Sequence, residues 1–269
     1  MKNIISIHGV PRSGTSWLGQ LIDSNPDVCY KFQPLFSNTF RNKINLSTPN
    51  TEILKVISEI ANTEDDFIDR VIEKENGIHY KFDKKSRNPN YFAMKHVRYH
   101  YLIPKFLELR EIKILAIVRN PCGVLNSWQN APKEFRNSDG SFVDEWYYGM
   151  SRNNFSPDEF FGFNKWKELT TYFVNIESNY PEKLHIIRYE DLVLNTKESL
   201  FKIFKFIGIP FDNQTRDYID ISQKKHVSDV YSTFKGNMNV NDWQISLDSQ
   251  IIEKIYAELS GTELERFIQ

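Results

Sequence analysis

A short β-branched run that breaks into a glycine-bounded turn constrains this chain more than any other stretch. Residues 3–8 (NIISIH) are mostly apolar, which predicts a buried strand. The turn that follows contains Gly9 and Gly14, and the apolar spacing beyond it predicts a helix from about residue 15. A strand, turn and helix start in this order bring backbone N–H groups and the positive end of a helix dipole to one point, so the sequence predicts a phosphate or sulfate site there.

The turn has the glycine spacing of a Walker A loop but lacks its lysine. A Walker A loop reads G-x-x-x-x-G-K-[ST], and here Thr15 takes the lysine position while a cation, Arg12, lies earlier in the turn. We therefore expect a phosphate-binding loop that serves a ligand other than a nucleoside triphosphate.

Strand-like and helix-like patterns alternate along the 269 residues, which is typical of a three-layer α/β fold with a central parallel sheet. The predicted strands are 3–8, 27–32, 91–97, 112–118 and 184–188, and the predicted helices are 15–24, 100–110, 121–130, 158–178 and 196–207. Two segments, about 39–90 and 131–160, interrupt this rhythm, and the first contains amphipathic runs at 51–61 and 65–75. We expect a single domain, 1–269, in which these insertions shape a binding pocket.

Charge and cysteine usage narrow the class of protein. The formal net charge is −1, so no long-range field favours nucleic acid or an anionic membrane, and an anion site must be local. Cys29 and Cys122 lack metal-ligand spacing and are interpreted as buried thiols of a reducing compartment. Without an apolar run of about 18 residues, and with a strand that starts almost at Met1, we expect a soluble, cytoplasmic protein.

A second motif follows the strand 112–118. Arg119 stands at its carboxyl end, Asn120 suits the cap of the next helix and Pro121 suits its first turn. Ser127 lies a little over two helical turns further on, so Arg119 and Ser127 are expected to reach one phosphate together.

These two motifs resemble those of the sulfotransferases that use 3′-phosphoadenosine-5′-phosphosulfate (PAPS), a family with a P-loop-like fold. The stretch P-R-S-G-T-S-W is similar to the family's 5′-phosphosulfate loop, and V-R-N-P-x(5)-S is similar to its 3′-phosphate motif. The resemblance implies that the 5′ side is held by Arg12, Ser13, Gly14, Thr15, Ser16 and Trp17, and the 3′-phosphate by Arg119 and Ser127.

Two later stretches extend the resemblance. R-Y-E-D-L at 188–192 is similar to a family segment whose tyrosine lies near the adenine, which implies that role for Tyr189. F-K-G is similar to a late R-K-G loop that closes over the 3′-phosphate. Phe234 replaces the arginine of that loop, so only Lys235 and the Gly236 backbone are carried over as phosphate contacts.

The chemistry that the resemblance implies is transfer of sulfonate from PAPS to a hydroxyl group, with 3′-phosphoadenosine-5′-phosphate (PAP) as the product. The transition state is expected to be loose and in line, with charge growing on the bridging oxygen. Arg12 is the predicted catalytic cation at that oxygen. We find no acidic cluster suited to a metal and predict no metal requirement.

The base that removes the acceptor proton is predicted on the strand 91–97. Its K-H pair is similar to the K-T-H segment of small-molecule sulfotransferases, which makes His96 the candidate base, with Lys95 and Arg98 orienting the ligands. The carbohydrate branch carries an acid in N-P-D-V-x(4)-E-P-L, but that position is Gln33, whose amide accepts no proton at neutral pH. Weaker alternatives are His8, His100, Asp23 and Glu190.

The N-P-D-V segment at 25–28 favours a glycan or glycoconjugate acceptor, although a small alcohol, phenol or lipid stays open. Aromatic side chains that could stack on sugar rings are Trp128, Phe135, Trp146, Tyr147, Tyr148 and Trp166.

Two other classes of function remain, a P-loop kinase that uses ATP and magnesium, and a non-catalytic nucleotide-binding module.

Overall fold

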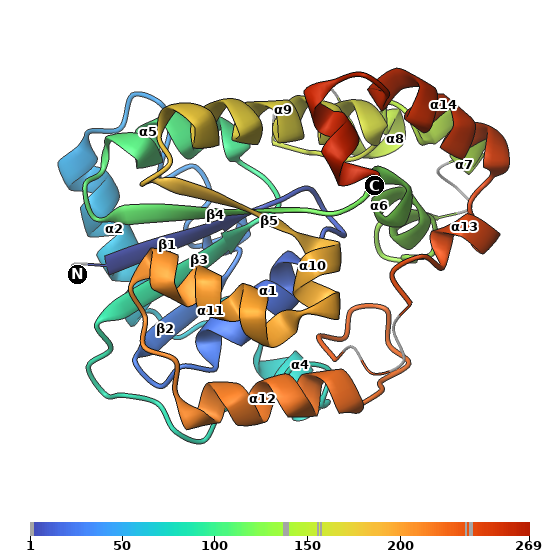
Figure 1. Ribbon diagram of the computed structural model, residues 1–269. Helices are drawn as coiled ribbons and strands as arrows, with labels where there is room; N and C mark the ends of the chain where they lie inside the picture. The colour runs from blue at the N-terminus through green and yellow to red at the C-terminus, as the bar shows by residue number, and fades with distance from the viewer. Residues whose placement is uncertain (1–2, 137–139, 155, 157, 235, 237–238) are drawn as a thin grey trace.

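A parallel sheet of five strands lies at the centre of the molecule (Figure 1). The computed structural model describes residues 3–269 except 137–139, 155, 157, 235 and 237–238. The strands are β1 (Asn3–His8), β2 (Val28–Phe32), β3 (Tyr91–His96), β4 (Ile112–Val118) and β5 (Leu184–Arg188), in the order β2-β3-β1-β4-β5. The predicted α/β fold is confirmed, and each predicted strand is present to within one residue at either end.

β1 is the central strand of the sheet, with two strands on each side of it. It pairs in parallel with β3 on one side, where Ile5 is in register with Ala93, and with β4 on the other, where Ile5 is in register with Lys113. Its isoleucines are buried on both faces, as expected for a parallel sheet that is covered by helices on each side.

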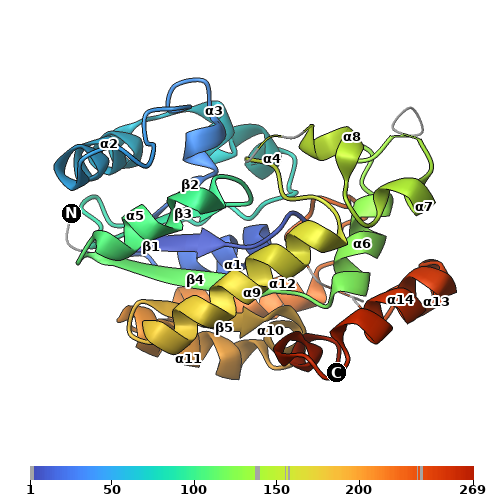
Figure 2. The same cartoon turned by 90° about the horizontal axis from the view of Figure 1, so that it is seen from above.

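Helices cover both faces of the sheet and form two hydrophobic cores (Figures 1 and 2). One face packs against α5 (Ile103–Glu108), α9 (Phe163–Asn179) and α14 (Ser249–Leu259). The opposite face packs against α1 (Thr15–Asp23), α11 (Thr196–Ile207) and α12 (Asn213–Lys224). Successive strand residues alternate between the two cores, so Ile4 belongs to the first and Ile5 to the second.

The remaining elements surround this sandwich. The segment 39–90 carries α2 (Asn50–Asn62), α3 (Asp66–Asp69) and α4 (Val71–Glu75), which lie beside β2 (Figure 2). The other helices are α6 (Pro121–Gln129), α7 (Phe142–Glu145), α8 (Met150–Asn153), α10 (Tyr189–Leu194) and α13 (Trp243–Ser246), and short 3-10 turns cover Pro34–Phe36, His100–Leu102 and Glu263–Phe267.

Helix boundaries differ from the predictions where the backbone turns left-handed. The amphipathic run 65–75 forms two helices, because Arg70 has φ 56° and separates α3 from α4. The helix predicted over 158–178 begins only at Phe163, since Gly162 (φ 87°) precedes it. Within the described part of the chain, every helix is too short or too polar to cross a bilayer.

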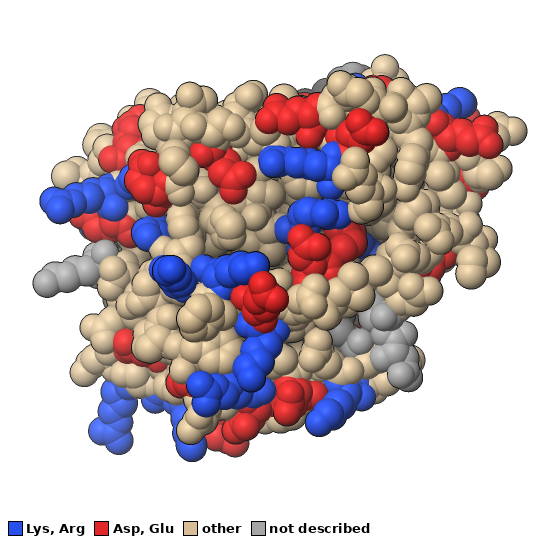
Figure 3. Space-filling view, viewed as in Figure 1, with Lys and Arg blue, Asp and Glu red and all other residues tan. Residues whose placement is uncertain are grey.

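Basic and acidic side chains lie next to one another on the face shown in Figure 3. This mixed surface agrees with the net charge of −1.

Candidate functional site

A cavity of about 230 Å³ lies at the carboxyl edge of the sheet, and every strand contributes to it. Ligands of open parallel sheets bind at this edge, where neighbouring strands connect in opposite directions, which here occurs between β1 and β4. Its lining from the strand ends consists of Pro11, Arg12, Gly14, Thr15, Ser16 and Trp17 after β1, Phe32 and Gln33 from β2, Lys95, Val97 and Arg98 from β3, Arg119 after β4 and Tyr189 after β5.

The loop after β1 has the conformation of an anion cradle. Arg12 and Gly14 both have positive φ, 72° and 92°, which turns successive N–H groups inward. A Cβ on Gly14 would lie 2.5 Å from the ring of Tyr189, so only glycine fits under that ring. α1 begins at Thr15, and its N-terminus adds the positive end of a helix dipole.

The two arginines predicted for opposite ends of one ligand meet in this cavity. Nη1 of Arg119 donates to the carbonyl oxygen of Arg12 at 3.2 Å. The Arg119 guanidinium lies over the Tyr189 ring, 4.7 Å from its centre. Its Nε is buried and, among the described residues, has no hydrogen-bond partner, which leaves a donor for an anion.

Arg12 is held by groups from three other segments. Nε donates to Ser127 Oγ at 3.1 Å, Nη2 donates to the Val230 carbonyl at 2.8 Å, and a Glu134 carboxylate oxygen lies 3.8 Å from Nε. The guanidinium also lies 5.2 Å from the centre of the Tyr231 ring. Ser127 therefore contacts the 5′-loop arginine as well as lining the same cavity as Arg119.

α6 starts as the second motif predicts. The Asn120 side chain accepts from the Cys122 N–H, and Pro121 occupies the first turn. Gly123 was not recognised from the sequence, although a Cβ there would lie 2.9 Å from Nε of Arg119. A glycine inside a short helix was the available signal, since it usually has a packing reason.

Lys95 and Arg98 reach the cavity from the end of β3. Lys95 Nζ donates to Ser16 Oγ at 3.0 Å and lies 4.0 Å from the centre of the Phe32 ring. Burial and the nearby Arg70 lower the pKa of Lys95 well below its usual value. Arg98 pairs with Glu159 at 2.6 Å and donates to Gln33 Oε1 at 3.3 Å.

The structure does not bring His96 to the cavity. Adjacent strand residues point to opposite faces, so Lys95 faces the cavity while His96 lies in the other core. The His96 ring lies 5.0 Å from that of His8, and His8 Nδ1 is 3.0 Å from His100 Nδ1. Burial and the neighbouring Lys95 lower the pKa of His96 to about 3.

Other predicted residues also lie apart from the cavity wall. Ser13 is buried, and the Gly236 N–H donates within its own loop to Lys225 O at 3.1 Å. Lys235 lies outside the described residues. Asp23 pairs with Lys85, and Glu190 accepts from the Asn120 N–H. Of the aromatic residues considered for sugar stacking, none lines this cavity: Trp128, Phe135, Trp146, Tyr147, Tyr148 and Trp166.

Several lining residues were not recognised from the sequence. Arg70 and His79 come from the segment 39–90, and Val230, Tyr231 and Ser232 come from the segment after α12. No motif pointed to them, because their place depends on how these segments pack on the strand ends.

Comparisons with known proteins agree with this geometry. A family model described as "Sulfotransferase domain" matches residues 2–257. Mouse carbohydrate sulfotransferase 1 is 26% identical over 191 residues, which cover 62% of this chain and 42% of that protein, so the chain spans less than half the length of this curated relative.

Solved structures show the same fold. A mouse sulfotransferase complexed with PAP is 15% identical, with a TM-score of 0.56 over 100% of this chain and 88% of that one. A retinol dehydratase in complex with retinol and PAP is 13% identical, with a TM-score of 0.55 over 98% of this chain and 83% of that one.

Proposed function

This chain belongs to the sulfotransferase domain family, and from that membership we propose that it transfers the sulfonate group of PAPS to a hydroxyl group of an acceptor. The observation that carries the proposal is the meeting of Arg12 and Arg119 in one cavity, where two guanidiniums are within reach of one doubly phosphorylated ligand. The relatives crystallised with PAP support the choice of nucleotide.

The residues present fit such a ligand. The loop with positive φ at Arg12 and Gly14, together with the start of α1, would hold the 5′-phosphosulfate. Arg119, with its unpartnered Nε, would hold the 3′-phosphate at the start of α6. Tyr189 is the proposed neighbour of the adenine.

The reaction is a displacement at sulfur. The acceptor oxygen forms a bond to sulfur while the bond from sulfur to the bridging oxygen breaks, and PAP departs with the electron pair. Arg12 supplies positive charge where the negative charge grows, and Lys95 supports the loop by donating from Nζ to Ser16 Oγ. Preorganised donors of this kind stabilise the transition state without reorganisation during the reaction.

We propose a glycan or glycoconjugate as the acceptor. The similarity to a carbohydrate sulfotransferase and the N-P-D-V segment at 25–28 support it. The insertion 39–90 supplies Arg70 and His79 to the cavity next to Gln33, and we propose that this side receives the acceptor. A small alcohol, phenol or lipid acceptor is the alternative.

The test is transfer of labelled sulfonate from PAPS to a panel of glycans, phenols and sterols, combined with thermal unfolding. We expect PAP to raise the melting temperature more than ATP with magnesium does. At a PAP concentration 100 times its Kd, binding adds about 2.7 kcal/mol to stability. A larger shift with ATP and magnesium would favour the kinase, and PAP binding without transfer to any acceptor would favour the non-catalytic module.

A further inference from the structure

The acceptor side of the cavity needs a group that takes up a proton. Gln33 presents an amide there, and His96 lies in the opposite core, so neither supplies one. A hydroxyl attacking sulfur must lose its proton as the new bond forms, and a positioned base accelerates that step.

His79 lines the cavity from the segment that follows α4. Its side chain is 97% buried, since only 3% of its surface is exposed. Its Nδ1 has no hydrogen-bond partner in the described part of the chain. A buried ring nitrogen that has no protein partner and lies on a cavity wall is free to meet a ligand there.

A chain of three contacts connects this imidazole to the phosphate-binding loop. The His79 ring packs edge-on against Phe32, at 6.3 Å between ring centres. Phe32 is the same ring over which Lys95 Nζ lies, and Lys95 in turn donates to Ser16 of the phosphate-binding loop. His79 and Lys95 thus contact the same Phe32 ring, which places His79 beside the loop on the proposed acceptor side.

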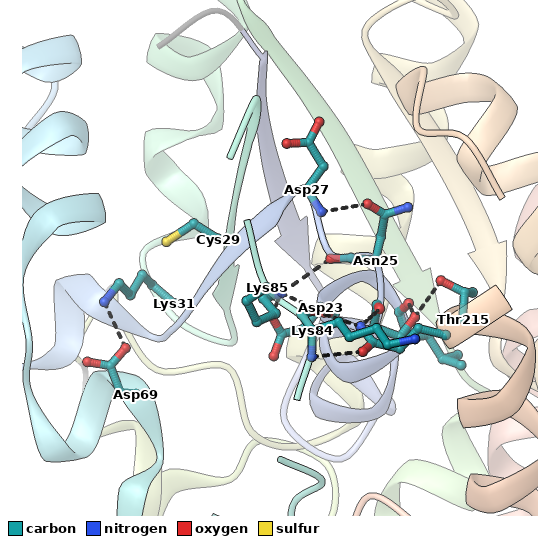
Figure 4. Close-up of polar contacts among 12 residues, drawn as sticks. Asp23, Asn25, Asp27, Cys29, Lys31, Asp69, Lys84, Lys85 and Thr215 are labelled. Atoms are coloured by element: carbon teal, nitrogen blue, oxygen red, sulfur yellow. Dashed lines mark hydrogen bonds and ion pairs between the residues drawn. The ribbon is translucent and has the colours of Figure 1, made fainter. Parts of the chain in front are cut away.

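The backbone around His79 is tied down at both ends. The N–H groups of Ile78 and His79 donate to the Glu73 carbonyl at 2.9 and 3.0 Å, and the Ile78 carbonyl accepts from the Thr233 N–H at 3.2 Å. The arm that precedes His79 is formed by α3 and α4. It is attached to β2, because Lys31 Nζ donates to Asp69 Oδ1 at 2.7 Å (Figure 4). The imidazole is therefore carried on a fixed support.

The other titratable groups on the cavity wall are less suited to the task. Glu134 faces Arg12 on the side of the cofactor loop, and Lys95 makes the contacts of an ammonium. Burial raises the pKa of Tyr189 and of Tyr231, so both phenols stay protonated. Among the described groups on the wall, His79 offers a lone pair on a side chain that neither faces Arg12, as Glu134 does, nor donates to the phosphate-binding loop, as Lys95 does.

We propose that His79 is the general base that deprotonates the acceptor hydroxyl, an assignment that rests on the proposed sulfotransferase function. The hydroxyl proton passes to a ring nitrogen of His79 while the acceptor oxygen bonds to sulfur and the sulfur–oxygen bond to PAP breaks. The protonated imidazole then releases its proton to solvent.

The charges around His79 keep its imidazole neutral while the cavity is empty. Burial, Arg70, Lys95 and Lys74 lower the pKa of His79 to about 3, so the imidazole is neutral at pH 7 and holds its lone pair. Glu73 pairs with Arg70 and offsets part of that effect. An anionic co-substrate in the cavity opposes the same cations and brings the pKa of His79 up towards the working range of a base.

The test compares His79→Gln with His185→Gln, a control whose imidazole lies on β5, partly exposed and outside the cavity. Each variant is assayed with an acceptor whose hydroxyl is un-ionised and with a phenol acidic enough to be ionised at the assay pH. We expect His79→Gln to lower kcat for the un-ionised acceptor by about 10²- to 10⁴-fold, and to change transfer to the ionised phenol far less. The control should match the wild type with both acceptors.

Three further readouts separate a base from a structural residue. Added imidazole should restore part of the rate of His79→Gly, and the affinity for PAP should be unchanged in both His79 variants. In an NMR titration of the wild type, PAP should raise the pKa of the His79 ring.

Equal losses with both acceptors, or no loss at all, would overturn the assignment. A loss specific to the un-ionised acceptor in Glu134→Gln instead would move the role to Glu134. Wild-type protein that binds no PAP, or sulfates nothing, would contradict the proposed function itself rather than the choice of base.

Discussion

Arg12 is fixed by the protein before any ligand arrives. Ser127, Val230 and Glu134 hold its guanidinium, and its backbone has φ 72°, a left-handed conformation that costs a non-glycine residue energy. Such strain persists only where the surroundings impose it. A preset cation loses little side-chain entropy on binding, which suits a group that must stabilise charge during the reaction.

Replacing Arg12 should therefore affect rate more than nucleotide affinity. We expect Arg12→Ala to lower kcat by about 10²- to 10³-fold, as the loss of one charge-stabilising donor does, with a much smaller change in the Kd for PAP. Arg12→Gly should be equally slow but more stable than Arg12→Ala by roughly 1 kcal/mol, because glycine adopts positive φ freely. Equal losses in kcat and PAP affinity would remove the catalytic role.

Gly123 offers a substitution that separates binding from stability. Alanine favours a helix interior over glycine by up to about 1 kcal/mol, so Gly123→Ala should not destabilise α6 by itself. Its Cβ, however, would lie 2.9 Å from Nε of Arg119 and push that side chain away. We expect PAP affinity to fall about 10- to 100-fold, in line with the loss of a charged hydrogen bond. Isothermal titration with PAP measures this affinity. The control is Gln129→Ala, at the exposed end of the same helix. Unchanged affinity in Gly123→Ala would show that Arg119 does not hold the ligand.

The sequence predicted that Arg12 and Arg119 lie in one cavity, because each follows a strand and the carboxyl ends of parallel strands meet at one edge of the sheet. It did not predict His79 or Gly123. An isolated histidine in a polar segment has no pattern of its own, and the role of Gly123 depends on where the Arg119 side chain lies.

At the scale of elements, strands were predicted closely and helix ends less so. The strands of a parallel sheet are buried on both faces and read as continuous apolar runs, so their bounds are visible in the sequence. The break at Arg70 depends instead on packing, since its guanidinium lies 4.2 Å from the centre of the Phe32 ring and pairs with Glu73. That contact belongs to the tertiary structure.

The arm that carries Arg70 and His79 depends on the ion pair between Lys31 and Asp69 (Figure 4). Asp69→Asn removes the charge partner of the buried Lys31 ammonium, and we expect a loss of roughly 1–3 kcal/mol in the free energy of unfolding. The acceptor KM should rise while the affinity for PAP is retained, because we propose that this arm lines the acceptor side of the cavity and not the nucleotide side. Urea unfolding and steady-state kinetics test both, and the double variant Lys31→Met with Asp69→Asn should recover part of the stability. A change in PAP affinity equal to that in acceptor KM would contradict the proposed division of the cavity into a nucleotide side and an acceptor side.

At the scale of the whole molecule, buried histidines make stability depend on pH. Burial lowers the pKa of His8, His96 and His100 in the first core, and the last two to about 3. The unfolded chain takes up protons near pH 6.5, whereas the folded protein does not until much lower pH. The stability that these neutral histidines contribute is therefore present above about pH 6.5 and is lost progressively as the pH falls towards 3.

We expect the free energy of unfolding to fall between pH 7 and pH 5, with each buried histidine contributing a slope of roughly 1.4 kcal/mol per pH unit below its unfolded pKa. Urea unfolding at a series of pH values measures this slope. His96→Leu should make this slope shallower. A slope in His96→Leu equal to that of the wild type would show that His96 is protonated in the folded protein.

The overall architecture followed from the alternation of apolar periods, because each strand–helix unit buries its own face on a shared sheet. The placement of the insertion 39–90 beside β2 did not follow. It depends on side-chain pairs such as Lys31 with Asp69 and Lys85 with Asp23, which join segments far apart in the chain.

The cavity draws its walls from residues as far apart as Pro11 and Ser232. No short contiguous piece of the polypeptide forms this cavity, and β1 pairs on both sides with strands that are synthesised long after it. The core behind the sheet also includes residues of α14, so the cavity is complete only when nearly all of the chain has folded.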